Sequence, residues 1–337
     1  MKFGVLTTPV WGRETEPKVQ FAQHRELLEV ADQLGFSMAV AGQHFLGSEL
    51  RYYQPVPYLT YLSQFAPRMQ MTIGLILLSL VNPVETAEQV ATLDAVTGGR
   101  AILGVGLGYS DHEFKAFGIP KATRVKRFEE GLALIKALWS GEEVNFEGEH
   151  FVVTKVMPSV LPVQKPRPPI WIGGNSEKAI RRAAALSDAW YAPPFPTHES
   201  LAQLRAVFLD ERARVGLPLD GAFPLRRELL IASSRAEARR LAAERSAERM
   251  NTYLKWGLGQ RLETENQNFG SQADEDIDSR FILGTADECA DALNQLREKL
   301  GMTHFMFKPQ WPGLPHKEAM HQLELFGTKV IPQLVKG

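Results

Sequence analysis

The sequence predicts a (β/α)8 barrel. Over 337 residues, short apolar runs alternate with amphipathic helical patterns about eight times, which is the rhythm of that barrel. Several of the runs are apolar without interruption, as is typical of strands that a parallel sheet buries on both faces. A doubly wound sheet is the alternative, because it shares the alternation and differs in strand order. We expect a single domain over residues 1–337, with a variable insertion at about 240–279.

The third and fourth predicted strands enclose the clearest βαβ unit. Apolar runs over 71–80 and 101–107 predict the two strands, and a helical pattern lies between them. Asn82 can cap that helix, Pro83 suits its first turn, and Gly98 is placed to end it. The unit therefore reads strand, helix, strand, with glycine-rich backbone just past the second strand.

The other elements follow from the same two patterns. Apolar runs bounded by glycine or proline predict strands, and apolar residues spaced three and four apart predict helices. A polar loop is expected over 110–122, and a small hairpin over 144–153 with its turn at Glu147-Gly148. The remaining predicted strands cover 2–8, 37–42, 169–172, 188–192, 224–232 and 303–307; the remaining predicted helices cover 17–34, 123–140, 177–186, 199–215, 236–250, 286–300 and 317–334, with one more beginning near Pro57.

The composition limits the compartment and the partners. The formal net charge of -1 argues against nucleic acid or an anionic membrane surface as the main partner. No stretch approaches the roughly 20 apolar residues of a membrane span. The one cysteine, Cys289, has no partner for an intramolecular disulfide, so a reducing cytoplasm is expected. We expect Cys289 to be a buried residue on a helix rather than a reactive thiol.

Functional side chains are expected in the loops that follow the strands, because the C-terminal face carries the active sites of these barrels. One such loop consists of Gly173, Gly174, Asn175 and Ser176, directly before a predicted helix. Glycines allow close approach, the side chains offer hydrogen bonds, and a helix N-terminus attracts anions, so this loop is a candidate phosphate site. The alternative is that Ser176 only caps the helix.

A second glycine-rich loop and a histidine complete the candidates. Gly106, Gly108 and Tyr109 follow the fourth strand. A dinucleotide fingerprint opens directly into a helix, whereas a polar loop is expected here, so we interpret the glycines as close backbone contacts at the barrel rim. His44 follows the second strand and offers proton transfer near neutral pH, although a lone histidine is often structural. No metal site is expected, because ligand spacing is absent from the sequence.

Seven segments resemble the bacterial luciferase-like family of flavin-dependent oxidoreductases. They are GQHF, NPVETAEQVATLDAVTGGRAILGVGLGY, EFKAFG, RFEEGLALIKALWSG, VNFEGEHF, PPIWIGGNSEKAIRRAAALSDAW and RFILGTADE. The resemblance implies a (β/α)8 barrel with a flavin at its C-terminal face, and usually a homodimer. It also implies that a separate flavin reductase supplies reduced FMN, which reacts with O2 and oxygenates a small organic substrate.

Carried over residue by residue, the resemblance assigns roles to the loops. The implied flavin-binding set is Gly173, Gly174, Asn175 and Ser176 at the phosphate, Gly106, Gly108 and Tyr109 at the ribityl chain, Asn82 beside the ring, and Ile76-Leu77 at a non-prolyl cis peptide beneath the ring. His44 would assist proton transfer or stabilise the flavin–oxygen adduct. The implied substrate pocket is Trp11, Tyr52, Tyr53, Lys308, Gln310 and Trp311. Asp94 and Arg100 are expected to form an ion pair under the barrel.

Three functions compete on this basis. The first is a flavin-dependent monooxygenase that uses reduced FMN. The second is a dehydrogenase or reductase on the same barrel that uses a 5-deazaflavin coenzyme and moves hydride without oxygen. The third is a flavin-binding barrel that has lost catalysis, which His44 and the intact glycine loops disfavour.

Overall fold

A computed structural model describes residues 1–7, 14–47, 51–194, 196–255, 277–310 and 314–335. The central sheet has eight parallel strands, in the order β8 (Ala189–Tyr191), β7 (Ile170–Gly173), β4 (Ala101–Gly106), β3 (Gln70–Leu77), β2 (Met38–Ala41), β1 (Lys2–Leu6), β12 (His304–Phe307) and β9 (Pro224–Arg226). A parallel bridge between Ala192 and Leu225 joins the two edges, and the Ala192 N–H donates to the Pro224 carbonyl over 2.9 Å. The sheet thus curls until its edges meet, which confirms the predicted barrel over the doubly wound sheet.

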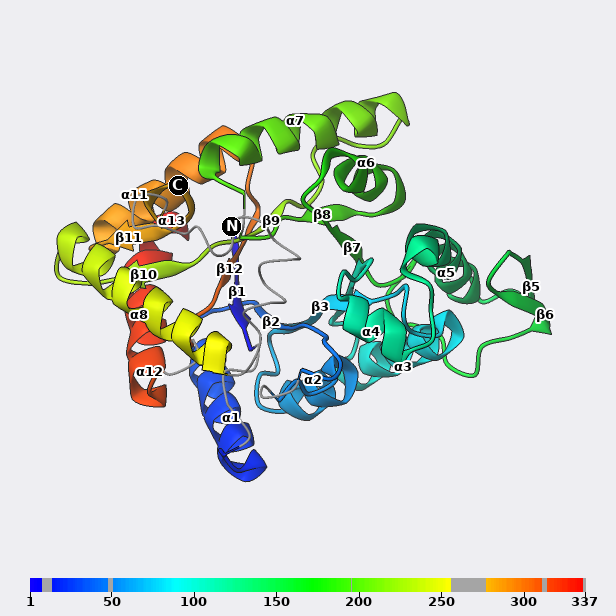
Figure 1. Cartoon of the computed structure of the whole chain (residues 1–337), viewed down its shortest axis with the longest axis horizontal. Helices are drawn as coiled ribbons and strands as arrows, with labels where there is room; N and C mark the ends of the chain where they lie inside the picture. The colour runs from blue at the N-terminus through cyan, green and yellow to red at the C-terminus, as the bar shows by residue number, and fades with distance from the viewer. Residues whose placement is uncertain (8–13, 48–50, 195, 256–276, 311–313, 336–337) are drawn as a thin grey trace.

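Helices surround the barrel and lead from each strand to the next (Figure 1). The helices are α1 (Pro17–Gln33), α2 (Pro55–Ser63), α3 (Pro83–Thr97), α4 (Asp111–Ala116), α5 (Arg124–Leu138), α6 (Glu177–Leu186), α7 (His198–Arg214), α8 (Arg235–Lys255), α10 (Ile277–Arg280), α11 (Ala286–Leu300), α12 (His316–Leu325) and α13 (Ile331–Val335). Most bounds lie within a few residues of the predicted ones, and those of α6 and α11 coincide with them. Of the predicted insertion, residues 256–276 lie outside the described residues.

Helix ends follow the local capping signals. The Asn82 side chain accepts a hydrogen bond from the first turn of α3, and Gly98 ends that helix with a left-handed φ of 65°. Ser176 caps α6 in the same way as Asn82 caps α3. Thr285 and Glu288 form a reciprocal capping box at the start of α11. These helix ends determine where the strand-to-helix loops begin and end, and the candidate residues lie in those loops.

The strand predicted over 224–232 is in fact two strands. β9 ends at Arg226, and β10 (Leu229–Ile231) leaves the barrel to pair in parallel with β11 (Ile282–Gly284). Arg227 lies between them, and its fully buried guanidinium donates to the carbonyls of Pro193 and Pro196, each over 2.9 Å. A buried guanidinium requires acceptors. The run of charged residues therefore interrupts an otherwise apolar strand.

Two other predictions need correction. The loop predicted over 110–122 contains α4 and a 3-10 turn at Lys121–Thr123. The last predicted helix is α12 and α13 joined by a π-helical turn, Phe326–Val330. The first correction concerns function, because α4 directly follows the glycine loop after β4.

The predicted hairpin is confirmed. β5 (Val144–Glu147) and β6 (Val152–Val156) pair antiparallel and project beyond α5, away from the barrel (Figure 1). On α5, the Glu130 carboxylate accepts hydrogen bonds from the backbone N–H groups of Glu149 (3.1 Å) and His150 (2.8 Å). These bonds attach the hairpin turn to the barrel's helical layer.

Asp94 and Arg100 do not form the expected ion pair. The Asp94 carboxylate accepts hydrogen bonds from the Ala101 N–H and from Gln164. Arg100 donates to backbone carbonyls, including those of Ala66 and Met69 at the N-terminal end of β3. Each side chain therefore holds loop backbone in place at the bottom of the barrel. Both residues are structural, but they do not pair with each other.

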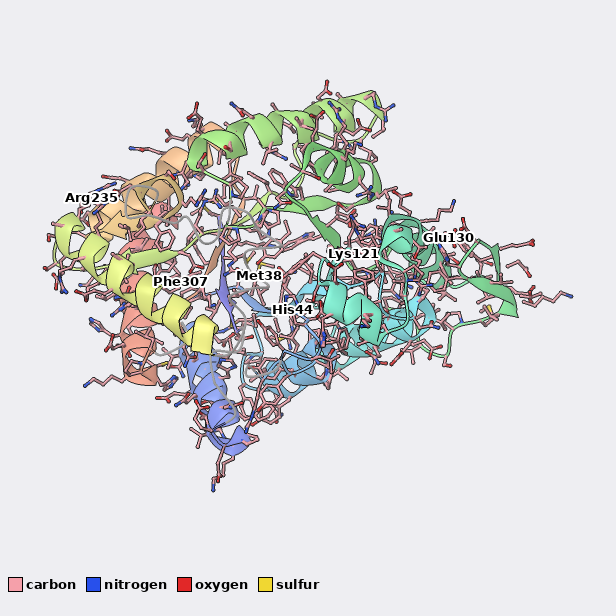
Figure 2. All side chains as sticks on the ribbon, in the orientation of Figure 1. Met38, His44, Lys121, Glu130, Arg235 and Phe307 are labelled. Atoms are coloured by element: carbon pink, nitrogen blue, oxygen red, sulfur yellow. The ribbon has the colours of Figure 1, made fainter. Side chains whose placement is uncertain are left out.

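Apolar side chains from the strands pack together inside the barrel. They include Leu6, Met38, Val40, Ile102, Trp171 and Met306, and Figure 2 shows Met38 at the centre among the strands. Cys289 is fully buried on α11, as expected, and desolvation, followed by the nearby Glu288 charge, raises its pKa to about 12. None of the helices in the described ranges is long and apolar enough to cross a membrane.

Candidate functional site

The mouth at the C-terminal ends of the strands is lined by glycines that face Leu75. A Cβ added to Gly173 would lie 2.3 Å from Leu75 Cδ1, and one added to Gly106 would lie 3.1 Å from the same atom. A Cβ on Gly104, one step lower, would lie 2.1 Å from the Ile73 carbonyl oxygen. Gly104 is therefore required where β4 approaches the β3 backbone, and Gly106 and Gly173 leave room for the Leu75 side chain, as the rim interpretation expected.

The cis peptide bond lies between Gly74 and Leu75, two residues before the expected position. The pairing of β3 with β4 shifts register between Ile73 and Ile76, on either side of this bond. Leu75 faces the glycine-lined mouth. Ile76 packs in the main core, and Leu77 packs with Leu80 and Phe114.

His44 lies just past β2 (Figure 2), and its ring contacts side chains from three other segments. Its Nδ1 atom is 3.2 Å from Glu113 Oε1, and its Nε2 atom is 3.4 Å from the Tyr109 hydroxyl. Tyr52 and Tyr109 contact the imidazole edge-on, with ring centroids 5.1 and 5.6 Å away. The side chain is 31 % exposed, so the imidazole is partly open to solvent.

Glu113 is the residue that the sequence interpretation missed. It lies on α4, where a loop was expected, and its carboxyl is only 2 % exposed. Oε1 also accepts the Phe45 backbone N–H over 2.7 Å, and Oε2 has no hydrogen-bond partner among the described residues. The Ser-x-x-Glu pattern of Ser110 to Glu113 was an available signal, because it is the capping-box sequence that announces a helix.

The loop Gly173 to Ser176 lies at the C-terminal end of β7 and opens directly into α6, with Asn175 and Ser176 exposed. The Ser176 hydroxyl accepts the Ala179 N–H over 3.3 Å, so its capping role is confirmed. The Gly174 carbonyl accepts a hydrogen bond from Trp190 Nε1 over 2.8 Å. In a trans peptide the carbonyl and the following N–H point in opposite directions, so the Asn175 N–H points away from Trp190.

These features fit a phosphate group. The loop is exposed, its backbone is free of bulky side chains, and a helix N-terminus offers unpaired N–H groups and a partial positive charge. Gly174 is required for the loop's position, because an added Cβ would lie 2.7 Å from Ala179 Cβ. The residues present therefore suit a phosphorylated flavin, with Gly106, Gly108 and Tyr109 on the neighbouring strand exit.

The side chains of Asn82 and Tyr53 have hydrogen-bond partners of their own. The Asn82 side chain is exposed and occupied by its cap on the Val84 N–H (2.8 Å). Tyr53 donates its hydroxyl hydrogen to Gln20 and packs on Phe21, between α1 and α2. It therefore contributes to packing, whereas its neighbour Tyr52 contacts His44.

The remaining pocket candidates divide into two groups. Lys308 and Gln310 are buried just past β12, and Gln310 hydrogen bonds His24 on α1. Burial, with a smaller contribution from His316, lowers the pKa of His24 to about 3, so this buried imidazole is neutral. Trp11 and Trp311 lie outside the described residues.

A family model described as luciferase-like monooxygenase matches residues 1–304. The chain belongs to the luciferase-like monooxygenase family. This match confirms the resemblance carried by the sequence segments.

The curated relatives include an enzyme named for reduced FMN. An FMNH(2)-dependent dimethylsulfone monooxygenase from Pseudomonas putida is 29% identical over 197 residues, covering 57% of this chain and 53% of that protein. The chain spans about half the length of the curated relatives it matches, or less.

Solved structures agree on the fold. The monooxygenase RslO1 from Streptomyces bottropensis superimposes with a TM-score of 0.85 at 24% identity, covering 98% of this chain and 99% of the other. A coenzyme F420 dependent tetrahydromethanopterin reductase from Methanopyrus kandleri gives a TM-score of 0.75 at 19% identity and covers 99% of each chain. At these identities the likeness establishes the shared luciferase-like barrel and leaves the reaction open.

Proposed function

We propose that this luciferase-like protein is a two-component flavin monooxygenase: it takes reduced FMN from a separate reductase and uses O2 to oxygenate a small organic substrate. The observation that carries the proposal is that the two halves of such a site open at one end of the barrel. The anion-binding loop at α6 and the His44 cluster both follow the C-terminal ends of barrel strands. The FMNH(2)-dependent relative supports FMN as the cofactor. A homodimer in the cytoplasm belongs to the same proposal.

The residues would divide the flavin among three strand exits. Gly174, Asn175 and Ser176 would bind the phosphate through backbone N–H groups and the N-terminus of α6. Gly106 and Gly108 would let the ribityl chain pass close to the backbone, with Tyr109 beside it. Since the Asn82 side chain caps α3, we assign it no contact with the ring.

Reduced FMN, when bound, would supply two electrons to O2, so that one oxygen atom enters the substrate and the other leaves as water. His44 would hold or move a proton at Nε2, the ring atom that faces Tyr109 at the mouth. Tyr52 and Tyr109 would keep the imidazole in place and exclude water from its edges. A proton transfer of this kind contributes about 10²- to 10⁴-fold to a rate.

A deazaflavin-dependent dehydrogenase is the second candidate function. The Methanopyrus reductase, which shares the barrel, is named for coenzyme F420. The same phosphate loop and the same histidine could bind that coenzyme and move a proton during hydride transfer. A catalytically inert flavin-binding barrel is disfavoured, because a protein that only binds flavin does not need a buried carboxyl bonded to a partly exposed histidine.

An anaerobic titration distinguishes these functions. Reduced FMN and reduced F420 are each added to the protein, and oxygen uptake is then followed with NADH and a purified flavin reductase. Tighter binding of reduced FMN, with protein-dependent oxygen chemistry, is the expected result. Tighter binding of F420 without oxygen chemistry would replace the proposal with the dehydrogenase, and flavin binding that leaves oxygen uptake unchanged would indicate the inert barrel.

A further inference from the structure

We propose that Glu113 is a positioning residue that holds His44 as the Nδ1–H tautomer and thereby makes Nε2 the proton-accepting atom at the mouth. The purpose of this proton transfer in catalysis rests on the proposed function. The assignment of the tautomer itself rests only on the geometry of the described residues.

The first step is the hydrogen-bonding role of Glu113 Oε1. This oxygen accepts the Phe45 backbone N–H over 2.7 Å, and a backbone N–H is always a donor. A proton on Oε1 would compete with that bond, so Oε1 is an acceptor whether or not the carboxyl is ionised. His44 Nδ1 lies 3.2 Å from the same oxygen. Nδ1 must therefore carry the hydrogen of this bond.

The second step follows from the chemistry of imidazole. A neutral ring that donates from Nδ1 has its lone pair on Nε2. The Tyr109 hydroxyl, 3.4 Å from Nε2, is then oriented to donate to it. Tyr109 is 46% exposed, which places this end of the imidazole at the solvent side of the cluster. The basic atom thus faces the mouth, while the bonded nitrogen faces the buried carboxyl.

The third step is that the bonds of Glu113 to His44 and Phe45 take the place of a local helix cap. Ser110 and Glu113 have capping-box spacing, in which each side chain would satisfy the other's backbone. The box does not form: Ser110 makes no side-chain cap, and its buried hydroxyl has no partner among the described residues. Glu113 instead reaches 68 and 69 positions back along the chain, to Phe45 and His44. A local cap given up for a long-range contact marks that contact as functional.

The test reads the tautomer directly in the cofactor-free protein. With 15N-labelled histidine, long-range proton–nitrogen NMR at about pH 8, above the ordinary histidine pKa, separates protonated from bare ring nitrogens. We expect a protonated Nδ1 and a bare Nε2 for His44. A His44 that is protonated on Nε2 in the unmodified protein would overturn the proposal, even if no variant could be studied.

Two variants of Glu113 distinguish the loss of the hydrogen-bond acceptor from a general effect on the fold. Glu113→Gln keeps a carbonyl oxygen for Phe45 and His44, so the Nδ1–H form should persist. Glu113→Met has similar length without that acceptor, so His44 should move toward the Nε2–H form. Glu130→Met is the matched control, because it removes another buried carboxylate, which accepts two backbone N–H groups and lies on α5 beside the hairpin. It should leave the His44 nitrogen signals unchanged.

Reoxidation of bound reduced FMN by O2, followed as oxidised-flavin absorbance in a stopped flow, gives the second readout. We expect Glu113→Met to slow it at least 10-fold with FMN affinity kept within about three-fold, and Glu113→Gln to recover part of the loss. Equal losses in Glu113→Met and the Glu130→Met control would show a merely structural role. If the protein binds no flavin, the proposed function fails, while the NMR result still decides the tautomer.

Discussion

Replacing Gly174 with alanine should weaken FMN binding without affecting riboflavin, which lacks the phosphate. The new Cβ would lie 2.7 Å from Ala179 Cβ, whereas ordinary contacts begin at 3.4 Å. The loop must therefore retreat from α6 by about 0.7 Å, which stretches an N–H to phosphate bond of about 2.9 Å beyond hydrogen-bonding distance. Losing one hydrogen bond to a charged group costs about 1.5–3 kcal/mol, or roughly 10- to 150-fold in affinity.

The assay is fluorescence titration of the Gly174→Ala protein with FMN and with riboflavin. Gly131→Ala on α5 is the control, because its added Cβ would have no neighbour closer than 3.6 Å. We expect the control to bind both ligands normally, and Gly174→Ala to lose at least 10-fold for FMN alone. Equal losses for FMN and riboflavin would mean that the loop does not hold the phosphate, and unchanged binding would mean that the loop does not contact the flavin.

Other consequences can be measured separately. His44→Ala should keep FMN affinity within a few-fold and lower turnover at least 10²-fold; unchanged turnover would reduce His44 to packing. The pKa of His24, about 3 in the fold and about 6.5 unfolded, means that the unfolded chain binds up to one more proton between about pH 3 and 6.5. Stability should therefore fall by about 2 kcal/mol from pH 7 to 5, and His24→Asn should lessen that loss in urea unfolding. Cys289 should react with a thiol reagent only after unfolding; rapid native labelling would contradict its burial and raised pKa.

The elements that local sequence determines were predictable. Asn82, Gly98 and Ser176 mark helix ends through bonds to nearby backbone, so their signals survive without knowledge of the fold. The buried strands were predictable because a parallel barrel requires continuous apolar runs. The α4 helix was missed because six residues give little periodicity, and its capping-box pattern lies within a polar segment.

Long-range partners were not predictable in the same way. The ion pair expected between Asp94 and Arg100 assumed that neighbours in sequence pair, whereas Gln164 and the carbonyls near β3 are the actual partners. Tyr52 and Tyr53 are adjacent, yet one contacts His44 and the other packs between α1 and α2. The contact of Glu113 with His44 likewise depends on the strand order, because β2 and β4 flank β3 and their exits therefore lie close together.

The most direct measurement of the central claim is a crystal structure of the protein soaked with FMN. The account predicts electron density for the flavin at the C-terminal mouth, with its phosphate on the Gly174 to Ser176 backbone and His44 Nε2 facing the ring side of the site. Density for the phosphate at any other strand exit, or a flavin bound outside the barrel mouth, would contradict it.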